Sequence, residues 1–166
     1  MFVRWQPLAG DRRRRAQSGD QLEGPSPVDG VGPVGHAHGL RPSCLGDGLG
    51  PALESLSRSS ALPLHVSYSG GDLPDHVSVT AYYVASEGVT NAVKHSGARR
   101  VALDVRRTDD GLHVAVHDDG AGGARIAGGT GLAMLHDRVR ALGGRLSVTD
   151  RQPAGTSLVA VIPCGS

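Results

Sequence analysis

The chain has 166 residues, of which 39% are hydrophobic and 20% charged, enough apolar material for one ordinary domain and too much for a wholly disordered protein. The formal net charge is only +1, so no basic excess indicates a nucleic-acid partner. No run approaches the roughly 18 apolar residues that span a bilayer, and residues 1–10 lack the apolar segment of a signal peptide, so we expect a soluble, cytoplasmic protein without a membrane segment.

Residues 1–38 are predicted to form a disordered tail. Four consecutive arginines at 12–15 are followed by a stretch with Pro or Gly every few positions and no hydrophobic periodicity. Such a segment buries too little apolar surface to offset the entropy lost on ordering. The arginine run is compatible with a nucleic-acid or membrane patch, but a solvated tail is favoured for a run this short and isolated.

The predicted order begins near residue 40. Leu49, Leu53 and Leu56 recur at helical spacing, which predicts a short amphipathic helix, and the alternation over 63–69 predicts a strand. A long helix is predicted over 75–95, with Asp75 as its N-cap and a glycine immediately after its end.

Two predicted hairpins complete the chain. Strands at 99–108 and 112–118 are joined by an Asp-Asp-Gly turn. After a glycine-dense segment, a helix over 132–142 precedes strands at 145–150 and 156–163. This order predicts an α/β fold, a two-layer α/β sandwich in which helices cover one face of a mixed sheet.

One face of the predicted long helix carries a row of polar residues. Glu87, Asn91 and Lys94 stand at i, i+4 and i+7, and His95 flanks them. A carboxylate, an amide oxygen and a cation in one row suit a site for Mg²⁺ and a polyphosphate, because Mg²⁺ takes oxygen ligands. Taken alone, the row is equally compatible with a solvated helix face.

Three glycine-containing motifs follow. Asp118 begins a D-x-G-x-G sequence in which Gly120 and Gly122 allow close approach of a ligand, although a simple turn would also explain it. Residues 128–132 read Gly-Gly-Thr-Gly-Leu and open a helix, whose free N–H groups can bind an anion; a flexible connector is the alternative. Gly-Thr at 155–156 enters the last strand and means little alone.

All four motifs occur in this order within about 70 residues, each on the expected element. Together they resemble the ATP-binding domain of the gyrase–chaperone–histidine-kinase superfamily and, more narrowly, the catalytic domain of NarL-type sensor histidine kinases. The resemblance covers roughly residues 74–163. Residues 39–60 resemble a remnant of the linker to a dimerisation domain, which leaves 61–166 as the expected ATP-binding catalytic domain.

The resemblance implies ATP and Mg²⁺ as cofactors and assigns roles to the motif residues. Asn91 would coordinate Mg²⁺, Glu87 would polarise the attacking group, and Lys94 and His95 would lie near the phosphates.

On the nucleotide side, Asp118 would accept a hydrogen bond from the adenine amine, assisted by Thr156 through water. The remaining members would bring backbone close to the base or the phosphates: Gly120, Gly122, Gly129, Thr130, Gly131 and Leu132. The second acid, Asp119, is expected near the phosphates, where it would weaken binding slightly.

The implied activity is transfer of the ATP γ-phosphoryl group to a histidine on a dimerisation domain, for relay to a response regulator. No acidic, arginine-flanked acceptor helix precedes residue 40, and we interpret His136 as a surface residue, so the acceptor histidine is expected on another chain. An anti-sigma-factor-type serine kinase and a non-catalytic ATP-binding regulatory module remain the alternatives.

Overall fold

A mixed β-sheet backed by helices makes up the part of the chain that the computed structural model describes, residues 42–124 and 131–165. These residues belong to one compact unit. In chain order, the elements are η1 (Ser43–Leu45), α1 (Leu49–Ser59), β1 (Leu64–Ser69), α2 (Asp75–Asn91), the π-helical turn η2 (Ala92–Ser96), β2 (Val101–Thr108), β3 (Gly111–Asp118), α3 (Gly131–Ala141), β4 (Arg145–Asp150) and β5 (Thr156–Ile162).

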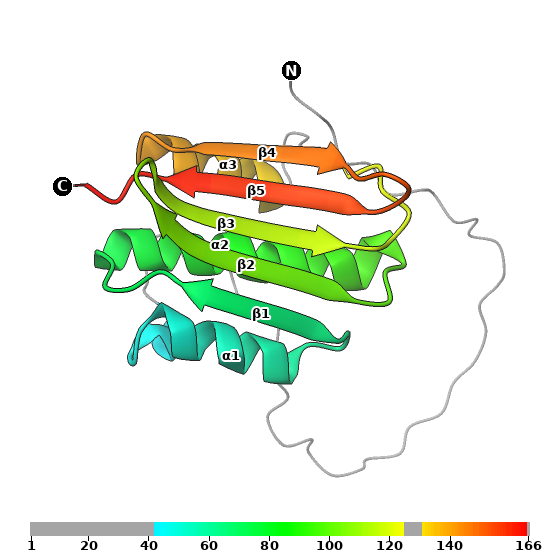
Figure 1. Cartoon of the computed structure of the whole chain (residues 1–166), viewed down its shortest axis with the longest axis horizontal. Coiled ribbons are helices and arrows are strands. Elements are labelled where there is room, and N and C mark those ends of the chain that lie inside the picture. Colours follow the sequence, from blue (N-terminus) through cyan, green and yellow to red (C-terminus); the bar gives the residue numbers. More distant parts are fainter. Residues whose placement is uncertain (1–41, 125–130, 166) are drawn as a thin grey trace, which may run out of the picture. The chain divides into compact units, whose positions relative to one another are not determined.

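The sheet has the strand order β1-β2-β3-β5-β4, with β1 and β2 parallel and every other pair antiparallel. Helices α2 and α3 lie behind the sheet in Figure 1, while α1 lies beside the edge strand β1. The predicted two-layer α/β sandwich with a mixed sheet is therefore confirmed. None of the described helices has the length and apolarity needed to cross a membrane.

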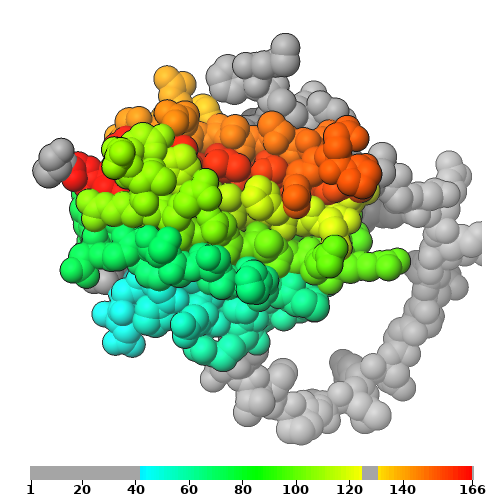
Figure 2. Space-filling view, viewed as in Figure 1, coloured from blue at the N-terminus to red at the C-terminus, as the bar shows by residue number. Residues whose placement is uncertain are grey.

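The core lies between the helices and one face of the sheet, as the alternating strands predict. Val101, Leu103 and Val105 of β2 point inward and are buried, as are Val77 and Val84 of α2. Residues between the buried ones form the uncovered face, which is the one turned toward the viewer in Figure 2. Close packing of helix on sheet fixes where α2 ends relative to the strand ends, and this sets the geometry of the site.

Both ends of α2 differ in detail from the prediction. Pro74, not Asp75, is the N-cap residue, because its carbonyl oxygen accepts hydrogen bonds from the N–H groups of Val77 and Ser78, both at 3.0 Å. Asp75 is instead the first helical residue, where a negative charge still complements the helix dipole. At the other end, the helix changes to a π-helical turn after Asn91, and Gly97 ends it in the left-handed conformation at φ 65°.

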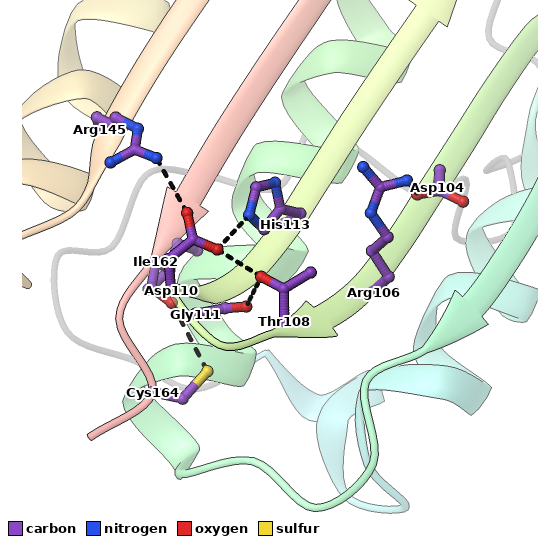
Figure 3. A network of polar contacts seen from close by, with 9 residues as sticks. All are labelled: Asp104, Arg106, Thr108, Asp110, Gly111, His113, Arg145, Ile162 and Cys164. Carbon is purple, nitrogen blue, oxygen red and sulfur yellow. Dashed lines mark hydrogen bonds and ion pairs between the residues drawn. The ribbon is translucent and has the colours of Figure 1, made fainter. Parts of the chain in front are cut away.

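At the opposite end of the sheet, the turn between β2 and β3 contains a polar network centred on Asp110 (Figure 3). Its carboxylate accepts hydrogen bonds from Thr108 Oγ1 and from a guanidinium nitrogen of Arg145 at 3.0 Å, and lies 2.8 Å from His113 Nε2. These contacts join the hairpin turn to the edge strand β4. The Asp110 carboxylate is thus paired with the Arg145 guanidinium and contacts His113.

Candidate functional site

A cavity lies between the end of α2, the start of α3 and the end of the sheet where β3 finishes and β5 begins. The cavity volume is about 30 Å³ in this structure. The lining residues are Gly88, Asn91, His95, Ser96, Val116, Asp118, Gly122, Ala124, Leu132, Val148, Thr156 and Leu158.

The cavity brings together six of the residues predicted for the site, from four separate segments of the chain: Asn91, His95, Asp118, Gly122, Leu132 and Thr156. Glu87, Lys94, Gly120 and Gly131 are described but do not line it. Gly129 and Thr130 lie outside the described residues. The convergence of distant motifs on one cavity is the main structural feature of the site.

The face of α2 that meets the cavity is shifted by one position from the predicted row. Gly88, Asn91 and His95 line it, whereas Lys94 is exposed and is not among the lining residues. Gly88 allows the helix to pack closely on the sheet, since a Cβ there would lie 2.8 Å from Val116 Cγ2 and 3.0 Å from Leu158 Cδ2. The wide π-helical turn after Asn91 then directs His95 toward the cavity.

Glu87 lies against the first residue of α3. A Cβ on Gly131 would overlap the Glu87 carboxylate, so only glycine fits there with the side chain in its present position. The start of a helix offers free N–H groups and the positive end of the helix dipole, which favour a nearby carboxylate. The same features would favour a phosphate, so the Glu87 carboxylate lies next to the predicted phosphate site.

Asp118 and Thr156 form the polar floor of the cavity, and each is only 7% exposed. The Gly120 N–H donates to Asp118 Oδ1 at 2.8 Å. Gly155 makes their proximity possible, because a Cβ there would overlap the Asp118 carbonyl oxygen and its φ is 113°. The carboxylate is thus held by its own loop while it faces the cavity.

The glycines of the D-x-G-x-G loop serve different contacts. Gly120 packs against Ser96, which a Cβ at position 120 would overlap. Gly122 lines the cavity, and a Cβ there would lie 3.1 Å from the Gly155 carbonyl oxygen. The N–H of the next residue, Gly123, donates to Asp150 Oδ1 at 2.6 Å. The loop is therefore fixed to β4 on one side and to the end of α2 on the other.

The charge of His95, which lines the cavity, depends on its neighbours. Its partial burial and the Lys94 ammonium lower the pKa of the imidazole, and Glu87 partly opposes this effect. The ring is therefore neutral at pH 7, so it can donate or accept a hydrogen bond without adding positive charge.

Two nearby residues have contacts that the sequence did not predict. The Asp119 carboxylate does not line the cavity and accepts hydrogen bonds from the Arg99 and Arg100 N–H groups. His136 is not fully on the surface, since its side chain is only 17% exposed and Nδ1 lies 3.5 Å from Asp137 Oδ1.

Sequence reasoning missed half of the cavity lining. The apolar walls come from Val116, Val148 and Leu158, which are buried strand positions and were predicted only as strand residues. Alternation alone identifies such residues as buried but does not show which of them border a cavity. Gly88 could have been found, because it shares a helix face with Asn91 and His95 at i, i+3 and i+7.

The donor set near α2 fits a Mg²⁺ ion that is also held by phosphate oxygens. The Asn91 amide oxygen and the Glu87 carboxylate are the oxygen ligands that this ion prefers. Within residues 42–124 and 131–165, no group of three His, Cys, Asp or Glu side chains could hold a metal by itself. A cation here would therefore depend on ligands brought by the nucleotide and water.

Comparison with known proteins identifies the relatives of this arrangement. The family model described as histidine kinase-, DNA gyrase B- and HSP90-like ATPase matches residues 76–166. The nitrate/nitrite sensor protein NarX of Escherichia coli K12 is 31% identical over 121 residues, which cover 68% of this chain and 20% of NarX. The histidine-protein kinase/phosphatase UhpB of Salmonella typhimurium is 35% identical over 121 residues, covering 66% of this chain and 24% of UhpB. The chain thus spans about a fifth to a quarter of these relatives.

Solved structures show the same fold. The histidine kinase domain of the blue-light-activated kinase EL346 from Erythrobacter litoralis superposes with a TM-score of 0.58 at 26% identity, covering 70% of this chain and 63% of that one. The ATP-binding domain of PrrB from Mycobacterium tuberculosis gives a TM-score of 0.50 at 24% identity over 69% of this chain and 88% of that one, a likeness of fold alone.

Proposed function

The chain belongs to the histidine kinase-, DNA gyrase B- and HSP90-like ATPase family, and we propose that it binds Mg²⁺–ATP in the cavity and transfers the γ-phosphoryl group to a histidine. The supporting observation is that Asn91, Asp118 and Thr156, from separate motifs, converge on one cavity. The acceptor histidine belongs to a dimerisation domain on another chain. A response regulator then receives the phosphoryl group, and we place this relay in the cytoplasm, where ATP is available.

Asp118 is the residue that recognises adenine. Its buried carboxylate accepts a hydrogen bond from the exocyclic amine, and Thr156 assists through water. Guanine has a carbonyl group at that position, so its binding would leave the buried carboxylate facing another acceptor. Such an unsatisfied group costs about 1–3 kcal/mol or more, and this cost selects ATP over GTP.

The end of α2 and the start of α3 would bind the phosphates and the metal. Asn91 would hold the Mg²⁺ ion, which when bound would neutralise charge on the phosphate oxygens. Lys94 and His95 approach the phosphates from the same helix, while Gly129, Thr130, Gly131 and Leu132 supply backbone N–H groups at the start of α3.

Glu87 polarises the attacking imidazole by accepting a hydrogen bond from its N–H group. For this it must leave its position against Gly131, where its carboxylate now lies. The negative charge of an incoming phosphate at the start of α3 provides the physical reason for that movement. Catalysis then depends on positioning and charge neutralisation, without a protein nucleophile on this chain.

Residues 61–166 form the catalytic domain in this proposal, and residues 39–60 correspond to the linker that joins it to a dimerisation domain in related kinases. Helix α1, within the linker region, packs on α2 and β1 through buried Leu49, Ala52 and Leu53.

A phosphotransfer experiment tests the proposal. The protein is incubated with γ-labelled ATP and Mg²⁺, alone and with a separately produced dimerisation domain of the same kinase subfamily. Acid-labile label on the added domain is the expected result. Acid-stable label on an anti-anti-sigma protein would identify a serine kinase instead, and ATP binding without any transfer would identify a regulatory module.

A pair of substitutions at Asn91 tests the site itself. Asn91→Ala removes the oxygen ligand and should abolish Mg²⁺-dependent ATP binding in isothermal titration calorimetry. Asn91→Asp keeps an oxygen ligand of similar size and serves as the matched control, for which we expect measurable binding. Unchanged affinity in Asn91→Ala would show that the nucleotide binds elsewhere.

A further inference from the structure

The loop that carries Asp118 is joined by hydrogen bonds to the turn that follows α2. The Arg99 and Arg100 N–H groups donate to Asp119 Oδ1, at 2.8 and 3.1 Å. The Ala121 N–H donates to the Ser96 carbonyl oxygen at 2.8 Å. Three hydrogen bonds thus join residues 96–100 to residues 119–121.

The Asp119 carboxylate is held in its charged form by these contacts. The backbone N–H groups of Arg99 and Arg100 lower the pKa of Asp119, and the Arg100 guanidinium, with Nε 3.2 Å from Oδ2, acts in the same direction. Hydrogen bonds to an ionised acceptor are the stronger kind. At pH 7, therefore, a charged acceptor holds two successive N–H groups of the turn.

Residues 96–100 are also joined by hydrogen bonds to the π-helical end of α2. Ser96 Oγ donates to the Ala92 carbonyl oxygen at 2.8 Å and accepts from the Ala98 N–H at 3.1 Å. The same helix end carries Asn91 and His95, which line the cavity. A continuous set of hydrogen bonds thus runs from the phosphate side of the cavity to the loop on the adenine side.

We propose that Asp119 is a positioning residue for nucleotide binding: it sets the separation between Asp118, which recognises the base, and Asn91, which holds the metal. It does so without contacting the nucleotide. This inference rests on the proposed function, because it assigns the two sides of the cavity to the base and the phosphates. Without the Asp119 carboxylate, the loop loses two of the three hydrogen bonds that join it to residues 96–100, and ATP then has to order the loop when it engages both sides.

Four variants test the inference. Asp119→Ala removes the acceptor, while Asp119→Asn keeps an oxygen at the same place and should rescue. Arg100→Ala removes only the exposed ion pair and leaves both backbone hydrogen bonds. Asp104→Ala is the matched surface control, since Asp104 also pairs with an arginine, Arg106 at 3.5 Å, but has no contact with the loop.

The first readout is the Kd for Mg²⁺–ATP at a temperature where every variant is folded, a quantity that a merely structural role would leave unchanged. We expect about a tenfold or larger increase for Asp119→Ala, corresponding to one charge-assisted hydrogen bond. Asp119→Asn should stay within about threefold of wild type and the two arginine-pair controls within about twofold, as expected for exposed ion pairs. An unchanged Kd in Asp119→Ala, with wild type binding normally, overturns the inference.

The second readout needs no nucleotide. Amide hydrogen exchange of Ala121 by NMR should be faster in Asp119→Ala and unchanged in Asp104→Ala. Unchanged exchange in Asp119→Ala overturns the inference on its own. If wild type binds no ATP, the proposed function fails, a result distinct from either of these. Should Asp119→Ala not fold, Asp119→Ser is measured in its place, with an intermediate increase in Kd expected.

Discussion

The two ends of strand β3 each carry a carboxylate, and the two are used in opposite ways. At one end, Asp110 is surrounded by Thr108, His113 and Arg145 in an exposed network (Figure 3). At the other end, Asp118 is buried, receives one N–H from Gly120 and faces the cavity. The charge at the first end is paired within the protein, whereas the charge at the second remains available to a ligand.

The difference shows how one sheet separates stability from binding. An exposed carboxylate with an arginine partner contributes modestly to the fold. A buried carboxylate such as Asp118, which forms no ion pair with an arginine or lysine among the described residues, has a desolvation cost that a ligand donor can offset, which is why such groups mark functional sites. Substitutions at the two ends should therefore alter different measurements, and three predictions test this separation.

The largest effects are expected from a matched pair of glycine substitutions. A Cβ on Gly120 would overlap the Ser96 carbonyl oxygen, and a Cβ on Gly111 would overlap the Ile162 carbonyl oxygen. Gly120→Ala should displace the Asp118 loop and weaken Mg²⁺–ATP binding about 100-fold, since loss of several kcal/mol of positioned contacts is expected. Gly111→Ala, at φ 132°, should instead lower the unfolding free energy by about 2 kcal/mol through backbone strain.

The two measurements for this pair are the Kd by calorimetry and the unfolding free energy by urea denaturation. Each variant serves as the control for the other, because both add one methyl group against a backbone oxygen. The proposed separation of the two ends would be contradicted by a large loss of affinity in folded Gly111→Ala. It would equally be contradicted by normal affinity in Gly120→Ala.

The second prediction concerns the charge that faces the cavity. Asp118→Asn keeps the shape but replaces one acceptor oxygen by a donor, so the adenine amine meets another N–H group. We expect ATP affinity to fall about 10- to 100-fold, in line with a cost of 1–3 kcal/mol for a mismatched buried group. The preference for ATP over GTP should fall as well, and competition between the two nucleotides measures it directly. Equal competition by GTP in wild type would refute the assignment of Asp118 to the base.

Strand positions and the main helix were predictable because their signals are local. The alternation in 101–108 reflects one buried face, and the stripe through Val77, Ala81 and Val84 reflects the other side of the same core. The cap was missed by one residue because Pro74 closes the first turn through its carbonyl oxygen, a contact with no side-chain signature.

The details of the site were harder to predict because they depend on phase and on distant partners. A π-helical turn changes which residues share a face, so His95 reaches the cavity and Lys94 does not. The partners of Asp119, at Arg99 and Arg100, are 20 and 19 positions away, and they are backbone groups that any sequence would supply. Sequence motifs thus identified the polar residues, while their contacts followed only from the packed structure.

The smallest effect is expected at the paired end. Asp110→Ala should lower the melting temperature slightly and leave the Kd for Mg²⁺–ATP unchanged, because the network is exposed and at the opposite end of the sheet from the cavity. Asp109→Ala is the matched control, since this neighbouring carboxylate has no hydrogen bond or ion pair with another described residue of the chain.

The stabilisation by Asp110 should depend on pH. The hydrogen bond from Thr108 and the contact with His113 lower the pKa of Asp110 in the folded protein. The folded state therefore binds the proton less readily than the unfolded state, in which the pKa is about 3.9. The stabilisation is fully present above that value and is lost as the pH falls through the lower folded pKa. The difference between the melting curves of wild type and Asp110→Ala should consequently be full at pH 7 and shrink progressively as the pH falls below about 4. A difference that stays constant over this acid range would show that the Asp110 charge is not what stabilises the turn.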